Sequence, residues 1–314
     1  MSRLDALGER RLIGRLGRAA ARTLRSGPLR VDAGIGDDAA VLGAPPGGRG
    51  LLLASDMLVE GVHFDRRHTA PEAVGWKALA CNVSDIAAMG GRPAAAVVSL
   101  GAPASTPPRW IARCYAGLIR CAARFGTAIV GGDTVRAPCV VIDVAILGVA
   151  PPRGAVRRDG ARPGDRLCVT GRLGGSYRSG RHAVFTPRVA EAQALVARCR
   201  PSAMIDVSDG LASDAWQLAR ASRVTLRIRT ADVPVAPAAG GVNAALNDGE
   251  DFELLFTVRP GARVPRRIGR CPVREIGRAI RRGAGVELED ASGRVRRVRA
   301  GGFEHFRKGR RGGP

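Results

Sequence analysis

The sequence predicts a mixed α/β fold of two domains with a boundary near residue 150. Its 314 residues are enough for about two domains of ordinary size. Apolar stretches of strand length mix with longer stretches of helical spacing, without the strict alternation of a doubly wound fold. A PPRG turn occupies residues 151–154. We therefore expect domains at residues 1–150 and 151–306, followed by a disordered basic tail at 307–314.

The first half carries helix and strand signals in turn. Helical spacing predicts a helix over residues 9–24. The sequence TAPE at 69–72 is a capping-box pattern, with Thr69 as N-cap and Glu72 three residues later, so a helix should run from there to Met89. A second helix is expected over 108–125, where apolar residues recur at helical spacing. Strands are predicted at 39–42, 51–54, 93–100, 127–130 and 140–149.

The sequence of the second half predicts fewer helices and strands. Apolar runs predict strands at 166–170, 203–205 and 252–258, and helical spacing predicts helices at 189–198 and 211–221. Residues 231–245 are rich in Pro, Ala and Gly and should form a loop.

The chain is strongly basic, with 50 Lys and Arg against 28 Asp and Glu and a formal net charge of +22. Nucleic-acid binding is one interpretation. However, 48 of the basic residues are arginine and they are spread along the chain. Even the densest stretch, residues 261–300, mixes twelve arginines with four acidic residues. A solvated basic surface that attracts nucleotides and phosphates is the favoured interpretation.

The seven cysteines contain no C-x-x-C pair, which argues against a zinc site and a thioredoxin-like site. We expect them to be reduced core residues of a cytoplasmic protein. The longest apolar stretch, 139–152, is interrupted by Asp143 and is too short to cross a bilayer, so no membrane partner is expected.

Acidic residues beside Gly or Ser recur at the predicted ends of apolar strands. Each pair alone is more typical of a turn. Together they suggest a shared site, because clustered carboxylates repel one another and a divalent cation with oxygen ligands removes that repulsion. The instances are Asp37-Asp38, Ser55-Asp56, Gly132-Asp133 and Asp206-Val207-Ser208-Asp209.

Asp85 strengthens this hypothesis. At about 100° per residue it lies within roughly 40° of Val74, Ala78 and Met89, on the apolar face of its predicted helix. An unpaired buried carboxylate is costly. An ion pair with an arginine would satisfy it, but the neighbouring Asn82 and the other carboxylates favour metal ligation.

Phosphate binding would have to use backbone amides, metal ions and arginines, because the sequence has no G-x-x-x-x-G-K-[ST] motif. The glycine segments 131–132 and 171–175 are candidate phosphate nests, and Arg136 and Arg158 are candidate clamps. No G-x-S-x-G motif is present and the four histidines lack metal spacing, which argues against a serine hydrolase and a zinc hydrolase.

At these residues the sequence resembles the thiamine-monophosphate kinase family. The GDD and GGD segments alone are typical of the broader superfamily of aminoimidazole-ribonucleotide-synthetase-like ATP enzymes. The matching segments follow in order along nearly the whole chain: GIGDDAA (34–40), SDMLVEGVHF (55–64), KALACNVSDIAAMG (77–90), GGDT (131–134), IDVSDGL (205–211), GEDFEL (249–254) and GFEHF (302–306).

The resemblance implies a two-domain α/β fold, in which the N-terminal sheet pairs with that of a second copy to form a barrel and a C-terminal α+β domain covers the nucleotide. It implies a homodimeric enzyme that uses ATP and several Mg²⁺ ions to phosphorylate thiamine monophosphate to thiamine diphosphate. We expect direct in-line transfer without a covalent enzyme intermediate, because no suitable nucleophile is present.

The resemblance also implies site residues. The implied magnesium ligands are Asp38, Ser55, Asp56, Asp85, Asp133, Asp206 and Asp209. The implied ATP contacts are Gly132, Asp133, Arg158 and Ser208. The implied contacts to the thiamine end are His63, Glu250 and Phe303, where Phe303 would stack on a ring.

The sequence departs from the family pattern at three places: Gly174-Gly175-Ser176, a short 177–188 segment, and Asn247-Asp248 before Gly249. These bear on phosphate gripping and substrate fit. Two alternatives stay open. One is a superfamily enzyme with another acceptor, although selenophosphate synthetase is disfavoured because its N-terminal Cys-Gly loop is absent. The other is a basic nucleic-acid-binding protein without catalysis.

Overall fold

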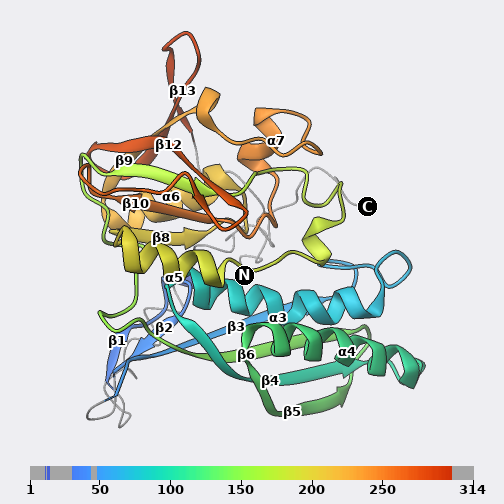
Figure 1. The fold of residues 1–314 in the computed structure, drawn as a ribbon. Helices are drawn as coiled ribbons and strands as arrows, with labels where there is room; N and C mark the ends of the chain where they lie inside the picture. The colour runs from blue at the N-terminus through green and yellow to red at the C-terminus, as the bar shows by residue number, and fades with distance from the viewer. Residues whose placement is uncertain (1–10, 12, 15–29, 44–47, 299–314) are drawn as a thin grey trace.

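The computed structural model describes residues 11, 13–14, 30–43 and 48–298 and confirms the mixed α/β fold (Figure 1). Its strands form two sheets, ordered β1-β2-β3-β6-β4-β5 and β14-β13-β9-β12-β7-β10-β8, with β11 beside β12. Pairing is antiparallel except at β4–β5 and β9–β13. The chain passes between the sheets after Val149, so the expected boundary at residue 150 lies at the start of this connection. The helix expected at 9–24 and the tail at 307–314 fall almost wholly outside the described residues.

The elements of the first half are β1 Val31–Ala33, β2 Ala40–Leu42, β3 Leu51–Val59, α3 Pro71–Ala88, β4 Arg92–Ala102, α4 Pro108–Phe125, β5 Ala128–Arg136 and β6 Val141–Val149. Those of the second half are β7 Arg166–Thr170, η2 Arg181–Ala183, α5 Val189–Arg198, β8 Ala203–Asp206, α6 Leu211–Ser222, β9 Val224–Arg229, η3 Thr230–Asp232, α7 Val242–Asn247, β10 Leu254–Val258, β11 Arg267–Ile268, β12 Cys271–Arg282, β13 Gly285–Glu289 and β14 Val295–Val298.

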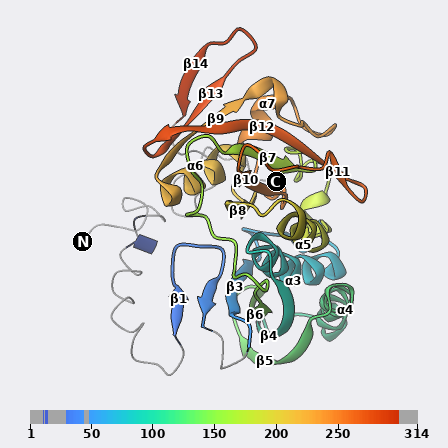
Figure 2. The ribbon, with the colours of Figure 1, turned by 60° about the vertical axis from the view of Figure 1, so that its left-hand side comes forward.

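Helix α3 lies between the first sheet and the second half of the chain (Figures 1 and 2). It is buried almost all round, with small and apolar residues such as Ala78, Leu79 and Ile86 facing neighbours on several sides. The predicted capping box is wrong. Ala70 is the N-cap and Pro71 begins the helix without a side-chain cap, and the Glu72 carboxylate instead pairs with Arg113 at 2.6 Å.

Helices α3 and α4 approach closely because each presents a glycine to the other. A Cβ on Gly75 would lie 1.8 Å from the Cys114 carbonyl oxygen, and one on Gly117 would lie 2.0 Å from the Glu72 carbonyl oxygen. Real Cβ atoms do not approach so near, so neither position tolerates a side chain without moving the helices apart.

The other face of the first sheet is not covered by any described element. On that face Leu53 and Met57 of β3, Val97 of β4 and Val130 and Val135 of β5 are all exposed. Two helices therefore bury one side of this sheet and leave the other apolar and open (Figure 1).

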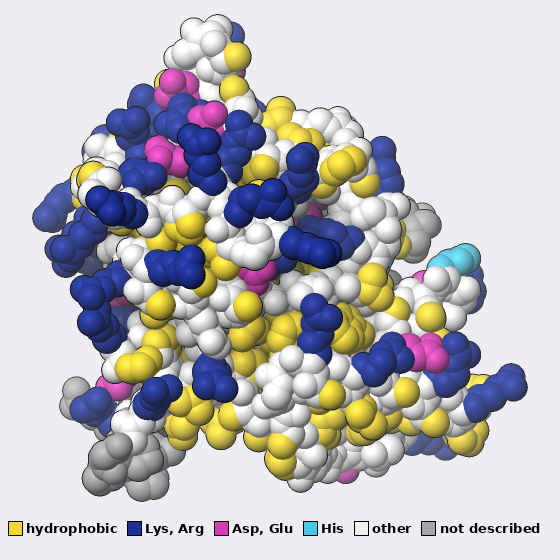
Figure 3. Space-filling model, in the orientation of Figure 1, with side chains coloured by type: hydrophobic (Ala, Val, Ile, Leu, Met, Phe, Trp, Pro, Cys, Tyr) yellow, Lys and Arg dark blue, Asp and Glu magenta, His cyan; other side chains and the backbone are white. Residues whose placement is uncertain are grey.

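The second half contains strands that the sequence analysis missed. The arginine-rich segment contains β11 to β14, which lie within residues 267–298 and were not predicted as strands. Along β12 the burial largely alternates, so that Val273 and Ala279 face the core while Arg274 and Arg278 face solvent. Lys and Arg side chains gather over this region in Figure 3.

No helix in the described part of the chain is both long and apolar enough to cross a membrane.

We expect Gly75→Ala to lower the free energy of unfolding by about 1–3 kcal/mol or more, because the new methyl group overlaps the Cys114 carbonyl. Thermal unfolding followed by circular dichroism measures the change. The matched control is Gly261→Ala, where a Cβ meets nothing within 4 Å. Equal melting temperatures for the two variants would contradict the close helix contact.

Candidate active site

Three carboxylates from distant parts of the chain meet where the two halves touch. Asp38 precedes β2, Asp85 lies on α3 and Asp206 is the last residue of β8. One oxygen of each lies within 4.8 Å of the others, and Ser84 Oγ donates a hydrogen bond to Asp206 at 2.5 Å. Hard divalent cations take such oxygen ligands. These residues therefore fit a magnesium site to which both halves contribute.

The electrostatics of this cluster are unfavourable without a cation. Burial, and then the charge of Asp56, raises the pKa of Asp85 well above its ordinary value. Burial, and then the charge of Asp38, does the same to the pKa of Asp206. Burial and the nearby Asp143 raise the pKa of Asp56 to about 6. Each carboxylate is thus desolvated and lies in the field of others, the combination that a bound cation relieves.

Asp56 reaches this region from the middle of a strand. The expectation that a strand ends at Ser55-Asp56 is wrong, because β3 continues to Val59. Side chains alternate across the strand, so Asp56 shares the buried face of Leu58, toward α3. Its backbone N–H donates to Asn82 Oδ1 of α3 at 3.1 Å. The Asp56 carboxylate therefore projects from one face of β3, within the strand, and not from the end of the strand.

Ser55 faces the opposite side of the same sheet. Its Oγ donates to Asp143 of β6 at 2.9 Å. Asp143 pairs in register with Ser99 of β4, and Ser99 pairs with Asp133 of β5, so Asp143 and Asp133 lie in one row across the sheet. Within one chain, β6 and β4 separate Asp133 from β3 by about three strand spacings, or about 14 Å. The structure thus does not bring Ser55 and Asp133 together with the carboxylate cluster.

Gly132 has a structural reason to be glycine. Its φ is +156°, and a Cβ there would lie 1.8 Å from the Val98 carbonyl oxygen of β4. The strand pair β4–β5 could not close with a side chain at this position.

Arg158 lies against the acidic cluster. Its Nε and Nη2 donate to the two carboxylate oxygens of Asp38 at 2.9 and 2.7 Å. Its backbone N–H donates to Asp37 at 3.1 Å, and its Nη1 donates to Gln217 at 3.0 Å. Burial, followed by the charge of Asp38, raises the pKa of Asp37 to about 7. The predicted phosphate clamp is therefore an ion-pair partner of a predicted metal ligand.

The start of α6 adds a second acidic group that sequence analysis missed. The fully buried Asp214 accepts a hydrogen bond from the Asp209 backbone N–H at 3.1 Å and another from Gln217 at 3.1 Å. Burial, and then Asp209, raises its pKa well above the ordinary value. Asp214 lies in the first turn of α6, where an acidic residue is common because it interacts favourably with the helix dipole. The sequence around it therefore gives no sign of its contact with Asp209.

A second cluster forms around the buried Lys77 of α3. Lys77 Nζ donates to Glu250 Oε1 at 2.5 Å and to the His63 carbonyl oxygen at 3.0 Å. The His63 ring accepts the Val59 N–H at its Nδ1 atom, at 3.0 Å. Two of the three predicted thiamine contacts, His63 and Glu250, therefore accept hydrogen bonds from the Lys77 ammonium group. The third, Phe303, lies outside the described residues.

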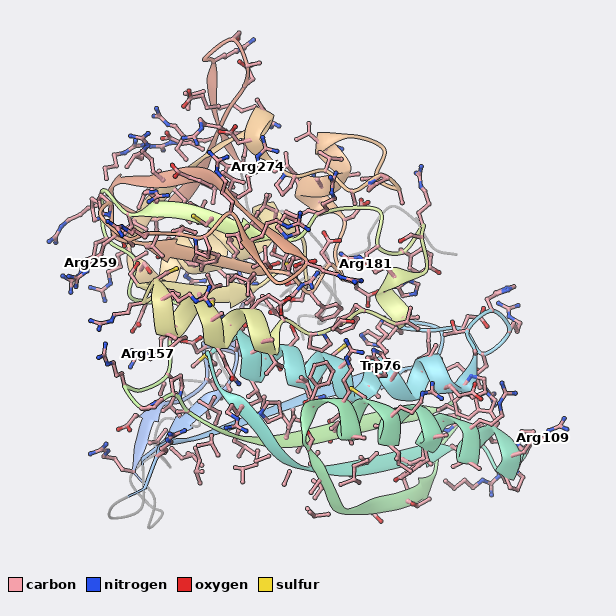
Figure 4. All side chains as sticks on the ribbon, in the orientation of Figure 1. Trp76, Arg109, Arg157, Arg181, Arg259 and Arg274 are labelled. Carbon is pink, nitrogen blue, oxygen red and sulfur yellow. The ribbon has the colours of Figure 1, made fainter. Side chains whose placement is uncertain are left out.

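Glu250 belongs to a turn with unusual backbone angles. Its φ is +60° and that of Phe252 is +49°, conformations that non-glycine residues adopt at a cost. The turn is held by its neighbours. Arg181 Nη2 donates to Asp251 at 2.9 Å, and Phe252 stacks on Phe185 with centroids 3.8 Å apart. The Trp76 indole N–H donates to the Phe185 carbonyl oxygen at 2.7 Å and so links α3 to this turn (Trp76 and Arg181 are labelled in Figure 4).

The glycine segment that departs from the family pattern holds the same turn. The Gly174 N–H donates to Asp251 at 2.7 Å, and the Gly175 N–H donates to Asp248 at 3.0 Å. Ser176 Oγ donates to the Glu250 carbonyl oxygen at 2.7 Å. The backbone N–H groups of Gly174 and Gly175, which belong to a candidate phosphate nest, thus already bind carboxylates of the protein itself.

The two clusters lie along one helix. Lys77 and Asp85 are eight residues apart on α3, which corresponds to about 12 Å along the axis and a rotation of about 80° around it. Ser208 is near both: it precedes Asp209, and its carbonyl oxygen accepts the Glu250 N–H at 2.7 Å. The site therefore has an acidic end and an end at Lys77 and Glu250.

Comparison with known proteins agrees with this architecture. Residues 36–150 match the family model described as AIR synthase related protein, N-terminal domain. A thiamine-monophosphate kinase of Synechococcus elongatus is 37% identical over 72% of this chain and 77% of the relative, and one of Rhodopirellula baltica is 36% identical over 88% and 92%. A solved structure of AaThiL complexed with AMPPCP and TMP covers 97% of this chain and 99% of its own at 32% identity, with a TM-score of 0.84.

These relatives are more than 30% identical and are covered for more than two thirds of their length. The resemblance inferred from the sequence motifs is confirmed, and the chain belongs to the thiamine-monophosphate kinase family.

Proposed function

We propose that this chain transfers the γ-phosphoryl group of ATP to the phosphate of thiamine monophosphate and forms thiamine diphosphate. The observation that carries the proposal is the two-ended site on α3. The acidic end suits phosphates bridged by cations, and the Lys77–Glu250 end, about 12 Å along the helix, suits the polar ring of an extended acceptor. The family relationship agrees with both ends.

Asp38, Asp85 and Asp206 would hold Mg²⁺, with Asp56 and Asp209 beside them. A bound Mg²⁺ would neutralise the charge of the two phosphate-bearing reactants. The protein's own groups position the reactants. Arg158 and Ser208 are assigned to ATP, and His63, Glu250 and Phe303 are assigned to the thiamine end. The acceptor phosphate is ionised at neutral pH, so the transfer needs no strong general base.

We assign Ser55, Gly132 and Asp133 to metal and nucleotide binding as well. Ser55 and Asp133 lie on the open side of the first sheet, away from the carboxylate cluster of their own chain, which connects this assignment to a homodimer. Two copies that pair these apolar faces would bury Leu53, Met57 and Val97 and close the two sheets into a barrel. The surface supports this assembly because exposed apolar residues gather on one face.

A cytoplasmic location is part of the proposal. All seven cysteines are free, and six of them are buried, as expected of a protein from a reducing compartment.

We expect purified protein to form thiamine diphosphate from ATP, Mg²⁺ and thiamine monophosphate, and Asp85→Ala to reduce this activity at least about a hundredfold. The substitution removes one oxygen ligand from the acidic end and so weakens cation binding, while the apolar core residues stay in place. Chromatographic detection of the product measures the rate, and circular dichroism checks the fold. The control is Asp290→Ala, an exposed carboxylate in the turn after β13. Full activity of Asp85→Ala would contradict the metal assignment.

We expect the melting temperature of the metal-free protein to fall as the pH rises from about 5 to about 7.5. The folded-state pKa of Asp56 is about 6 and that of Asp37 about 7, whereas an unfolded Asp titrates near 4. The folded state therefore holds protons that the unfolded chain has lost, and this stabilisation disappears as the pH passes the folded pKa.

Calorimetry in chelator measures this slope. Asp56→Asn should make it shallower and Mg²⁺ should restore stability at pH 7.5. The control Asp65→Asn should leave the slope in place, because the pKa of Asp65 is lowered to about 2. A melting temperature that rises across this range would refute the assigned electrostatics.

We expect Val97→Asp to convert the homodimer to a monomer, because the charge would lie in the centre of the paired sheets. Sedimentation velocity measures the mass. The control is Ile119→Asp on α4, which is exposed on the helix layer and not on the open sheet face. A monomeric parent protein, or a dimer that Ile119→Asp disrupts and Val97→Asp does not, would contradict the open face as the interface.

A further inference from the structure

Lys77 is unusual in this chain in both its type and its burial. It is one of two lysines among 50 basic residues, yet its side chain is only 2% exposed. Forty-eight of the basic positions hold arginine, so a lysine at a packed position on α3 indicates a need for a compact ammonium. A lysine nitrogen donates in three diverging directions, whereas a guanidinium is larger and planar.

The ammonium joins three segments. It is carried by α3, it donates to the Glu250 carboxylate at 2.5 Å, and it donates to the His63 carbonyl oxygen at 3.0 Å. The backbone of Glu250 is fixed separately, because its N–H bonds to the Ser208 carbonyl and its carbonyl accepts from Ser176. The direction of the Glu250 side chain therefore depends on Lys77.

The Glu250 carboxylate is accessible to a ligand while its partner is not. The Glu250 side chain is 29% exposed and that of Lys77 is 2% exposed. One carboxylate oxygen receives Lys77, which leaves the carboxylate able to accept a further hydrogen bond at its second oxygen. A buried ion pair with one open side is a fixed acceptor for a polar ligand group.

We propose that Lys77 is a positioning residue for the acceptor substrate: it orients the Glu250 carboxylate and the His63 segment so that they receive a hydrogen-bond donor on the substrate's ring end. This inference rests on the proposed function. Lys77 acts through Glu250, so its removal weakens acceptor binding and leaves ATP binding, at the acidic end of the site, unchanged.

The experiment compares wild type, Lys77→Met, Glu250→Gln and the double variant, with steady-state kinetics in each substrate. We expect Lys77→Met to raise the KM for thiamine monophosphate about ten- to hundredfold, as loss of a charge-assisted contact does, with the KM for ATP within about twofold of wild type. In the Glu250→Gln background, the same substitution should change the KM for thiamine monophosphate little further, because the contact it orients is already lost.

The double variant also distinguishes loss of substrate positioning from misfolding. Methionine has a similar volume to lysine. The Glu250→Gln substitution removes the partly buried carboxylate charge that Lys77→Met alone would leave unpaired. Arg227→Met, which removes an ion pair with Glu287 in the second sheet, is the control for general loss of stability and should leave both KM values unchanged.

An unchanged KM for thiamine monophosphate in Lys77→Met, equal rises in both KM values, or additive effects in the double variant would each overturn the positioning role. Failure of both Lys77 variants to fold would make Lys77 a folding residue and also overturn it. A wild-type protein that forms no thiamine diphosphate would instead refute the proposed function itself.

Discussion

The structure depends on bringing several carboxylates from both halves of the chain into one small space. Asp38 and Asp85 come from the first half and Asp206 from the second. Their mutual repulsion and desolvation oppose the contact between the halves. Ser84 and Arg158 supply hydrogen bonds and a positive charge that offset part of this cost. The remaining imbalance is the physical basis for binding cations at this place.

Helix α3 is the element that makes the site possible. It is packed against the first sheet, against α4 and against the second half, so its side chains have little freedom to move. The same helix carries Lys77 at one end of the site and Asp85 at the other. A rigid helix fixes the separation of these groups, and an extended substrate must match that separation. The close approach of Gly75 and Gly117 keeps the helix in register with α4.

The sequence predicted much of the site but not its geometry. The buried carboxylate Asp85 could be recognised because helical periodicity placed it on an apolar face. The positions of Ser55 and Asp133 could not be recognised, because a strand was expected to end where β3 and β5 in fact continue. Adjacent residues of a continuing strand point to opposite faces, which separates Ser55 from Asp56. The arginine-rich strands were missed because arginine on the exposed face masked the alternation of β12.

The sequence by itself determined the family, the mixed α/β class and the residue types that the chemistry requires, since motifs and periodicity are local properties of the chain. The tertiary structure decided which carboxylates share a space, that Arg158 pairs with Asp38, and that Lys77 meets Glu250 across 173 positions of sequence. The reason is physical: contacts between distant segments depend on how the two sheets pack on α3, and no local pattern encodes that packing.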